Sequence, residues 1–345
     1  MKISENVPLS SLTTMRLGGP AMFVVEAESK ADIPSAFSFA RSRNLPYYIL
    51  GAGANTIAHD EGFPGVIIKN SIKGITEEET GLITIMGGTV WDEAVEYSCK
   101  KEYTGIEALS KIPGLAGAAP VQNIGAYGQE ISQVLVSAEV YDINTGEFKT
   151  LSKDDFGFSY RKSILNTTEK HRYMVVSIKI QLKVGRMKRP FYNSLEKYIF
   201  DHNETVFTPE NIRKIVSEVR ASKLPDPAHI ASSGSFFKNI YVREEDVYGL
   251  TQRGIPVHRG NDGIKINAGW LIEQAGFAGQ YINGIRVNPN AALVLINENA
   301  SSYNDLAYAK NLIVNAVFQK FGYRLEQEPE EIVDNSQLMN AMLNS

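Results

Sequence analysis

The feature that most constrains the fold is the stretch IPGLAGAAPVQNIGAYGQEI (Ile112–Ile131), which is rich in glycine and proline and carries one charged residue. A solvated spacer would be polar throughout, whereas this stretch places Ile112, Leu115 and Val121 among its glycines. Glycine lacks a Cβ, so its backbone can lie directly against a bulky neighbour. The stretch therefore indicates backbone packed against something bulky, and a ligand is one candidate.

Composition limits the kinds of protein to consider. With 345 residues and 43% hydrophobic content, the chain can bury a large core, and its length favours two or three domains. The net charge of -4 argues against a general partner for nucleic acid or acidic membranes. The single cysteine excludes an intramolecular disulfide, and the histidines lack the spacing of metal ligands. The first residues lack the apolar core of a signal peptide, and no apolar run reaches membrane-span length, so a cytosolic protein is expected.

The first half of the chain alternates strand and helix patterns. Residues 29–43 carry apolar side chains at the spacing of one helix face, and Thr89 with Asp92 has capping-box spacing for a helix that begins at TVWDE. The turn Asn144-Thr145-Gly146 predicts a β-hairpin. Strands are expected at AMFVVEA, YYIL, GVIIKN, LITIM and YMVVSIKIQL, which together predict an α+β domain ending near Val184.

The following segment, VGRMKRPFYNSLEKYIFDHNETVF, is polar and charged, which favours a connecting segment or mobile loop. A second α/β unit then begins with Thr208 as N-cap and Pro209 at the first helical position. A short strand is expected around SGSFFKNI, a helix in INAGWLIEQAG and a strand in AALVLINEN. A long helix from Tyr303 to Lys320, ended by Gly322, would follow.

The segment ILGAGANTI resembles the start of a dinucleotide-binding fold, but two observations argue against that interpretation. Thr56 stands where the third glycine of the fingerprint would be, and the loop is too close to the next strand for a helical crossover. Backbone N–H groups of such a turn can still hold a pyrophosphate. A plain tight turn between two strands remains the alternative.

Seven motifs in order carry a resemblance to a known family: LGAGANTI, IPGLAGAAPVQNIGAYGQE, SYRKS, SKLPDP, GSFFKN, AGWLIEQAG and LEQE. The chain resembles the UDP-N-acetylenolpyruvoylglucosamine reductases, the flavoenzymes of bacterial cell-wall precursor synthesis, from about Thr13 to Glu328. This resemblance implies an α+β fold: a two-part FAD-binding domain of the PCMH/vanillyl-alcohol-oxidase type, plus a separate α/β substrate-binding domain. The domains implied are 1–200 (lobes of about 1–72 and 73–200) and 205–322, with 323–345 as a candidate to return to the first.

The resemblance also implies cofactors and a reaction. FAD, bound noncovalently, would be reduced by NADPH, and the substrate would be the enolpyruvyl ether of a UDP-sugar, reduced to UDP-N-acetylmuramate for peptidoglycan synthesis. The protein would act as a monomer in the cytoplasm, without a nucleic-acid or membrane partner. The residues implied in FAD binding are Gly51, Ala52, Gly53, Ala54, Asn55, Thr56, Gly117, Ala118, Gly125 and Tyr127.

Three catalytic residues follow from the motif positions. Arg161 would stabilise the substrate carboxylate, because a guanidinium pairs with a carboxylate in a fork. Ser235 would donate a proton to the substrate carbon, and Glu328 would hold or polarise the carboxyl end. Without the resemblance, Arg161 would be interpreted as a solvated strand-end arginine and Ser235 as a turn residue.

Substrate contacts are implied for Arg220, Lys223, Lys238 and Asn239 at the UDP diphosphate, and for Tyr192 on a loop found in one branch of the family. For Arg220, a basic residue that merely complements a helix end is an equal alternative.

Two positions depart from the family pattern. Glu328-Pro329-Glu330 replaces the usual Glu-Val-Arg, and Glu330 is a weaker candidate for the final glutamate. Ala291 stands where glutamine or histidine is usual, so one nucleotide contact is either missing or comes from Asn290.

Two other functions remain open at this point. The chain could be a different flavin oxidoreductase built on the same FAD domain, although the motifs GSFFKN and SKLPDP in the second unit favour the reductase. It could instead be an inactive nucleotide-sugar binding protein, against which Arg161, Ser235 and Glu328 argue together.

Overall fold

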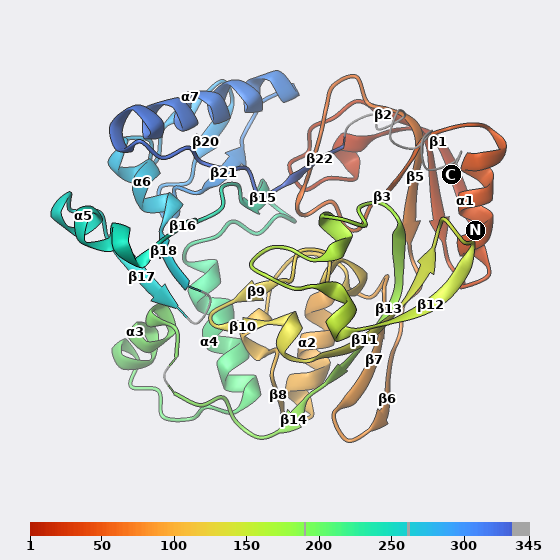
Figure 1. Cartoon of the computed structure of the whole chain (residues 1–345), viewed down its shortest axis with the longest axis horizontal. Coiled ribbons are helices and arrows are strands. Elements are labelled where there is room, and N and C mark those ends of the chain that lie inside the picture. Colours follow the sequence, from red (N-terminus) through yellow and green to blue (C-terminus); the bar gives the residue numbers. More distant parts are fainter. Residues whose placement is uncertain (190, 261–262, 333–345) are drawn as a thin grey trace.

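The computed structural model describes residues 1–189, 191–260 and 263–332 (Figure 1). The first unit is a four-stranded sheet in the order β1-β2-β5-β3, in which β2, β5 and β3 are parallel and β1 is antiparallel. Its strands are β1 (Lys2–Pro8), β2 (Pro20–Ala27), β3 (Tyr47–Ile49) and β5 (Phe63–Asn70). Helix α1 (Asp32–Ser42) buries Ile33, Ala36, Phe37 and Ala40, which confirms the predicted helix face.

The second unit is a five-stranded antiparallel sheet in the order β12-β11-β13-β7-β6. Its strands are β6 (Ile75–Glu79), β7 (Leu82–Met86), β11 (Leu135–Asp142), β12 (Glu147–Ser152) and β13 (Tyr173–Gln181). Gly146, with φ of 72°, closes the predicted β11–β12 hairpin. Strand β13 buries apolar side chains on both faces, because Val175, Ile178 and Ile180 pack with helix α2 (Trp91–Lys100) and Met174 and Val176 pack with α1.

The predicted capping box at the start of α2 is wrong. The helix begins at Trp91 with Val90 as its N-cap and no side-chain cap. The Thr89 hydroxyl instead exchanges two hydrogen bonds with the backbone of Gly74, at 3.0 and 3.1 Å. Asp92 accepts hydrogen bonds from Arg213 of a distant helix. Both side chains that local spacing assigned to a helix cap are instead hydrogen-bonded to residues from other parts of the fold.

The third unit holds the antiparallel sheet β15-β21-β20-β19 and the smaller sheet β16-β18-β17. Helix α7 (Tyr303–Phe321) covers the first sheet together with α6 (Ala268–Gln274), while α5 (Val247–Gln252) lies beside the second (Figure 1). Gly322, at φ of 82°, ends α7 as predicted. The strands are β15 (Ala231–Ser235), β16 (Ile240–Val242), β17 (Val257–Gly260), β18 (Gly263–Ile266), β19 (Tyr281–Ile282), β20 (Ile285–Val287) and β21 (Val294–Asn297). Met15 and Leu17 insert into this core from the N-terminal segment.

The segment predicted as a connection or mobile loop contains a helix, so that prediction is wrong over α3 (Asn193–Asp201). Phe191, Leu195 and Ile199 are buried there, against helix α4 (Pro209–Ala221). The charged side chains of Lys197 and Asp201 in α3 remain exposed. The Thr208 side chain accepts from the Asn211 N–H at 3.3 Å, which confirms the predicted cap of α4.

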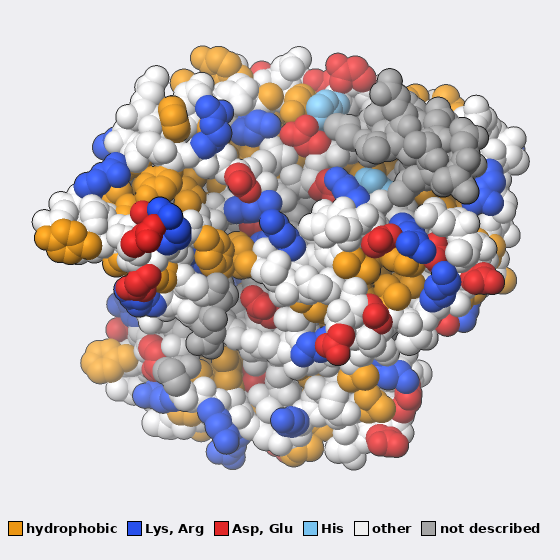
Figure 2. All heavy atoms as spheres, viewed as in Figure 1, with side chains coloured by type: hydrophobic (Ala, Val, Ile, Leu, Met, Phe, Trp, Pro, Cys, Tyr) orange, Lys and Arg blue, Asp and Glu red, His pale blue; other side chains and the backbone are white. Residues whose placement is uncertain are grey.

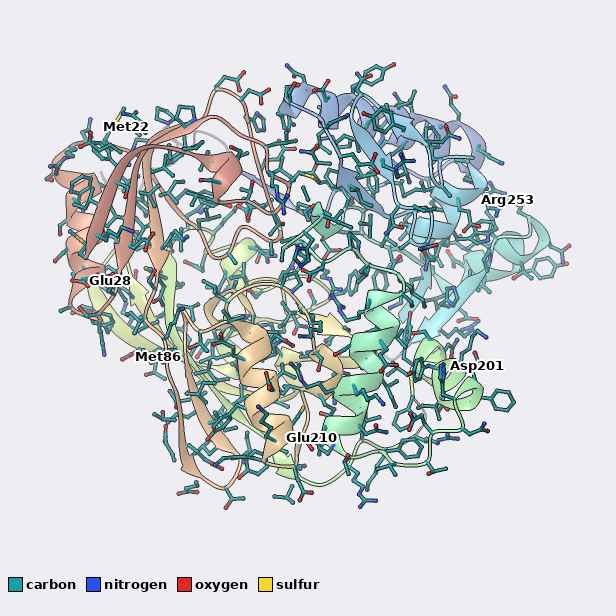
Figure 3. All side chains as sticks on the ribbon, turned by 180° about the vertical axis from the view of Figure 1, so that it is seen from behind. Met22, Glu28, Met86, Asp201, Glu210 and Arg253 are labelled. Atoms are coloured by element: carbon teal, nitrogen blue, oxygen red, sulfur yellow. The ribbon has the colours of Figure 1, made fainter. Side chains whose placement is uncertain are left out.

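Helix α4 packs on α2 and on the turn Glu107–Leu109, and Figure 3 shows Glu210 at its first turn, seen from behind. The division of the chain at residues 200–205 stays a prediction, and these contacts attach α4 to the second lobe. After α7 the chain returns to the first unit, where β22 (Glu330–Ile332) pairs in parallel with β4 (Thr56–Ala58). The remainder of the predicted returning segment, 333–345, lies outside the described residues.

Exposed hydrophobic side chains form several separate groups on the face in Figure 2. None of the helices in residues 1–189, 191–260 and 263–332 has the length and apolar content required to cross a bilayer.

Candidate active site

One cleft joins both glycine-containing loops. It holds about 1320 Å³ of space, part of it open to solvent, which suffices for a large cofactor. Gly51 to Thr56 line it from one side, and Gly117 and Ala118 from another. Gly125 and Tyr127, the other two residues predicted to bind FAD, are not part of this lining. Arg161, Lys238 and Glu328 complete one end of the cleft.

The loop between β3 and β4 is suited to hold an anion. Within the described chain, no backbone acceptor is found for the N–H groups of Gly51 to Asn55. Gly53 has φ of 65°, and a Cβ there would lie 2.1 Å from the carbonyl oxygen of Leu12. The glycine therefore lets the loop cross the N-terminal segment while its successive N–H groups stay available. Such a row of backbone N–H groups fits the diphosphate of a dinucleotide cofactor.

The glycines of the second loop have two different causes. Gly117 donates to the Gly87 carbonyl at 2.9 Å, and a Cβ on Gly117 would lie 3.1 Å from the Gly87 backbone, so this glycine allows two chain segments to touch. Gly114 lines the cleft with φ of 137° and open space where a Cβ would project. A Cβ on Gly51 would lie 3.5 Å from that of Ala118, so the two loops face each other. The sequence alone could not separate chain contact from ligand contact.

Arg161 and Glu328 form a partly buried ion pair in the lining of the cleft. Arg161 Nε donates to Glu328 Oε1 at 3.0 Å, and Nη2 donates to the Gly125 carbonyl at 3.2 Å. Burial raises the pKa of Glu328, although the charge of Arg161 opposes this rise. Burial acts to lower the pKa of Arg161, but the charge of Glu328, its hydrogen bond and the neighbouring Tyr160 and Glu130 together outweigh burial, so the pKa is raised. Arg161 has φ of 56°, a left-handed conformation that is uncommon for an arginine.

Backbone hydrogen bonds bring the strand that ends at Ser235 next to Glu328, although Ser235 itself is not among the residues that line the cleft. The N–H of Glu328 donates to the Phe236 carbonyl, and the N–H of Lys238 donates to the Glu326 carbonyl, both at 2.9 Å. Ser235 directly precedes Phe236 at the end of β15. The three predicted catalytic residues therefore gather from three distant segments: the turn at 159–162, β15 and the segment before β22.

Arg220 lies at the end of α4 beside Tyr127. Burial lowers the pKa of Arg220, and Tyr127 partly offsets the effect through charge and a hydrogen bond. No carboxylate lies within ion-pair distance of Arg220 among the residues that the structure describes. The Tyr127 ring meets the Tyr192 ring edge to face at 5.8 Å, and Tyr192 is 52% exposed. A desolvated cation without an anionic partner is suited to an anionic ligand group.

Lys223 and Asn239 are placed differently. Lys223 is exposed just beyond α4, and its carbonyl accepts from Asn288 at 2.9 Å. Asn239 accepts from the Ala268 N–H at 3.1 Å, at the start of α6. No described hydrogen bond or ion pair joins either side chain to Arg220.

Sequence reasoning missed Tyr160, which lies beside Arg161, and Lys265, which lies beside Tyr160. The charged groups of Arg161 and Lys265 lie 5.0 and 5.5 Å from the centre of the Tyr160 ring. An aromatic residue beside Arg161 in SYRKS was the available signal. Glu330, weighed as an alternative to Glu328, lines the cleft but pairs with Lys170 at 2.7 Å, and its N–H donates to the Asn55 carbonyl.

Comparisons with known proteins agree with this geometry. A family model described as an FAD binding domain matches residues 21–152, and one described as the UDP-N-acetylenolpyruvoylglucosamine reductase C-terminal domain matches residues 226–332. UDP-N-acetylenolpyruvoylglucosamine reductases of Aliivibrio fischeri and Porphyromonas gingivalis (strain W83) are 35% and 33% identical to this chain. Those alignments cover 95% and 96% of this chain, and 94% and 100% of the relatives.

A crystal structure of UDP-N-acetylenolpyruvylglucosamine reductase from Thermus caldophilus has the same fold, with a TM-score of 0.67. It is 24% identical and covers 96% of this chain and 100% of its own. The fold and the cleft define an FAD-binding α+β protein with a separate C-terminal domain, as predicted. The chain belongs to the UDP-N-acetylenolpyruvoylglucosamine reductase family.

Proposed function

We propose that this protein reduces UDP-N-acetylglucosamine enolpyruvate to UDP-N-acetylmuramate, with NADPH as the reductant and FAD as the cofactor, in peptidoglycan precursor synthesis. The observation that carries this proposal is the meeting of Arg161, Glu328 and the Ser235 strand at the end of the cleft that both glycine loops line. FAD, when bound, would supply the hydride chemistry that no side chain can provide.

The chain itself would hold FAD through backbone more than through charge. The N–H groups of Gly51 to Asn55 would bind the diphosphate, with Thr56 at the end of that loop and Gly117 and Ala118 opposite. Gly125 would contribute indirectly, because its carbonyl accepts a hydrogen bond from Arg161. Tyr127 lies beside Arg220, so we propose that it serves the substrate side of the site as well.

Arg161 would bind the substrate carboxylate and stabilise the negative charge that develops there during reduction. Glu328, whose pKa is raised by burial, would hold the same carboxyl end as a hydrogen-bonding partner. Ser235 would deliver a proton to the substrate carbon, which must be strongly basic because a hydroxyl is a weak acid.

Arg220, Lys223, Lys238 and Asn239 would contact the UDP diphosphate, and Tyr192 would cover the bound sugar nucleotide. The desolvated guanidinium of Arg220, which has no carboxylate within ion-pair distance among the described residues, gives this assignment its strongest support. Asn239 would bind the diphosphate through its amide N–H₂ group, because phosphate oxygens accept hydrogen bonds, while its own oxygen accepts from the Ala268 N–H. The branch of the family with the tyrosine loop, the monomeric state and the cytoplasmic location stay predictions, as do domains 1–200 and 205–322.

The test is a sequential reaction of the purified protein with its two partners. The protein with bound FAD should be yellow, should bleach with NADPH under anaerobic conditions, and should regain its colour when the enolpyruvyl substrate is added. Mass spectrometry should show a product two hydrogen atoms heavier than the substrate. Bleaching without return of colour would favour a different flavin oxidoreductase, and a yellow protein that NADPH does not bleach would favour a binding protein.

A further inference from the structure

Asn123 lies in the middle of the glycine-rich stretch but does not line the cleft. It is 2% exposed and has φ of 47°, so a polar side chain in a left-handed conformation is enclosed by protein. Asparagine tolerates this conformation better than most residues, but burial of its amide requires that the amide be hydrogen-bonded.

The Asn123 amide makes three hydrogen bonds to two other segments. Its Oδ1 accepts from the Ser132 N–H at 3.1 Å. Its Nδ2 donates to the Glu130 carboxylate at 3.0 Å and to the Ser159 carbonyl at 3.4 Å. The Ser132 hydroxyl also donates to the same oxygen of Glu130, at 3.4 Å.

Both acceptors of the Asn123 amide are connected to Arg161. Ser159 and Lys162 exchange two backbone hydrogen bonds of 3.1 Å and so close the tight turn that carries Arg161. The Glu130 side chain passes over Gly125, where a Cβ would lie 2.9 Å from Glu130 Cγ and 3.4 Å from Arg161 Nη1. We propose that Asn123 is a positioning residue for Arg161, acting through the base of this turn and through the Glu130 carboxylate. This inference rests on the proposed function.

The contacts of Arg161 show why its position matters. Glu328 and the Gly125 carbonyl occupy Nε and Nη2, and within the described residues no acceptor is recorded for Nη1. Nη1 is therefore the group left for the substrate carboxylate. The negative charge of Glu130 favours the charged guanidinium without an ion pair to it. A shift of the turn by about 1 Å would misplace Nη1, and such a misplacement costs about 100-fold in rate.

The test exchanges donor and acceptor between Asn123 and Glu130. Asn123→Asp keeps the shape and tolerates the positive φ, but its carboxylate would face the Glu130 carboxylate and could not donate to Ser159. Adding Glu130→Gln restores one hydrogen bond with its direction reversed. The matched control is Asn44→Asp, at an exposed asparagine with φ of 52°. Each variant is measured with bound FAD by stopped-flow absorbance, and substrate affinity is measured by calorimetry on the oxidised protein.

We expect Asn123→Asp to slow reoxidation by the substrate about 10- to 100-fold and to weaken substrate binding, while flavin reduction by NADPH stays within about 2-fold. The double variant should recover at least about 5-fold of the lost rate. Equal slowing of both half-reactions, an unchanged reoxidation rate, or no recovery in the double variant would overturn the inference.

If Asn123→Asp does not fold, Asn123→Gly removes the amide and keeps the backbone conformation, and the same difference between half-reactions is expected. A wild-type protein that neither binds nor is reoxidised by the substrate would refute the proposed function itself. The inference alone fails when the wild type reacts and the Asn123 variants show no selective loss.

Discussion

Asp92 links helix α2 to helix α4, and replacing it tests whether α4 depends on the second lobe. From α2, the Asp92 carboxylate accepts from Arg213 of α4 at 2.6 and 2.9 Å, and from the Lys111 N–H at 2.7 Å. Arg220 lies at the other end of the same helix. Asp92→Asn keeps the size of the side chain and removes its charge.

The pKa of Asp92 gives the magnitude. Burial alone would raise this pKa, but the hydrogen bonds from Arg213 and Lys111 outweigh it and lower the pKa from 3.8 to about 2. The difference corresponds to about 2 kcal/mol of folding stability. Because the folded pKa is the lower one, this stability is present above about pH 4 and is lost as the pH falls toward 2. The variant also leaves Arg213, only 13% exposed, without its main partner, so a loss of about 2 to 4 kcal/mol is expected at pH 7.

The assay is urea denaturation of the FAD-saturated protein, followed by tryptophan fluorescence, to which the buried Trp91 at the start of α2 and Trp270 both contribute. The stability difference from wild type should be constant between about pH 8 and pH 5 and should narrow below pH 4. Asp201→Asn is the control, because Asp201 (Figure 3) is 44% exposed and, within the described part of the chain, forms an ion pair with Lys197 of its own helix alone. A loss at pH 7 no larger than that of the control would refute the account of how α4 is held.

Three further predictions concern the cofactor and the substrate. Gly53→Ala should lower FAD affinity at least about 10-fold in a fluorescence titration, because its Cβ would meet the Leu12 carbonyl at 2.1 Å and shift the loop; an unchanged affinity would remove the loop from the cofactor site. Acid precipitation should release all of the flavin, since none of the described residues that line the cleft is histidine or cysteine, and yellow colour in the pellet would contradict this. Tyr192→Phe should weaken substrate binding about 2- to 10-fold in calorimetry, through loss of one hydrogen bond from an exposed hydroxyl, while an affinity equal to wild type would place Tyr192 outside the substrate site.

Local sequence signals predicted the elements whose ends are determined locally. Thr208 and Pro209 begin α4, and Gly322 ends α7, because caps depend on residues within one turn. Helix α3 was missed because its few buried side chains stand among charges, and only contact with α4 explains them. The capping box at Thr89 was wrong because Gly74, fifteen residues away, takes the hydroxyl.

In the candidate site, too, the sequence predicted some features and could not predict those that depend on tertiary contacts. Motif resemblance selected Arg161 and Glu328, and the structure places them 3.0 Å apart. Periodicity and composition could not have paired them, because 167 residues separate them along the chain. The hydrogen-bond network that supports Arg161 could not be predicted from the sequence either, because nothing in the sequence distinguishes Asn123 from the other residues of a glycine-rich loop. Its importance depends on where the turn at 159–162 comes to lie.

Ser235→Ala tests the central claim most directly, because the two half-reactions require different groups of the protein. FAD binding and bleaching by NADPH should remain near wild type, since neither needs a proton donated to carbon. Reoxidation by the substrate should slow by about 10²- to 10⁴-fold, the usual cost of losing one positioned proton donor. Ser235→Cys should recover part of that rate, because a thiol can also donate a proton. If stopped-flow absorbance shows Ser235→Ala reoxidised by the substrate at the wild-type rate, the assigned proton donor, and with it the proposed arrangement of the site, is wrong.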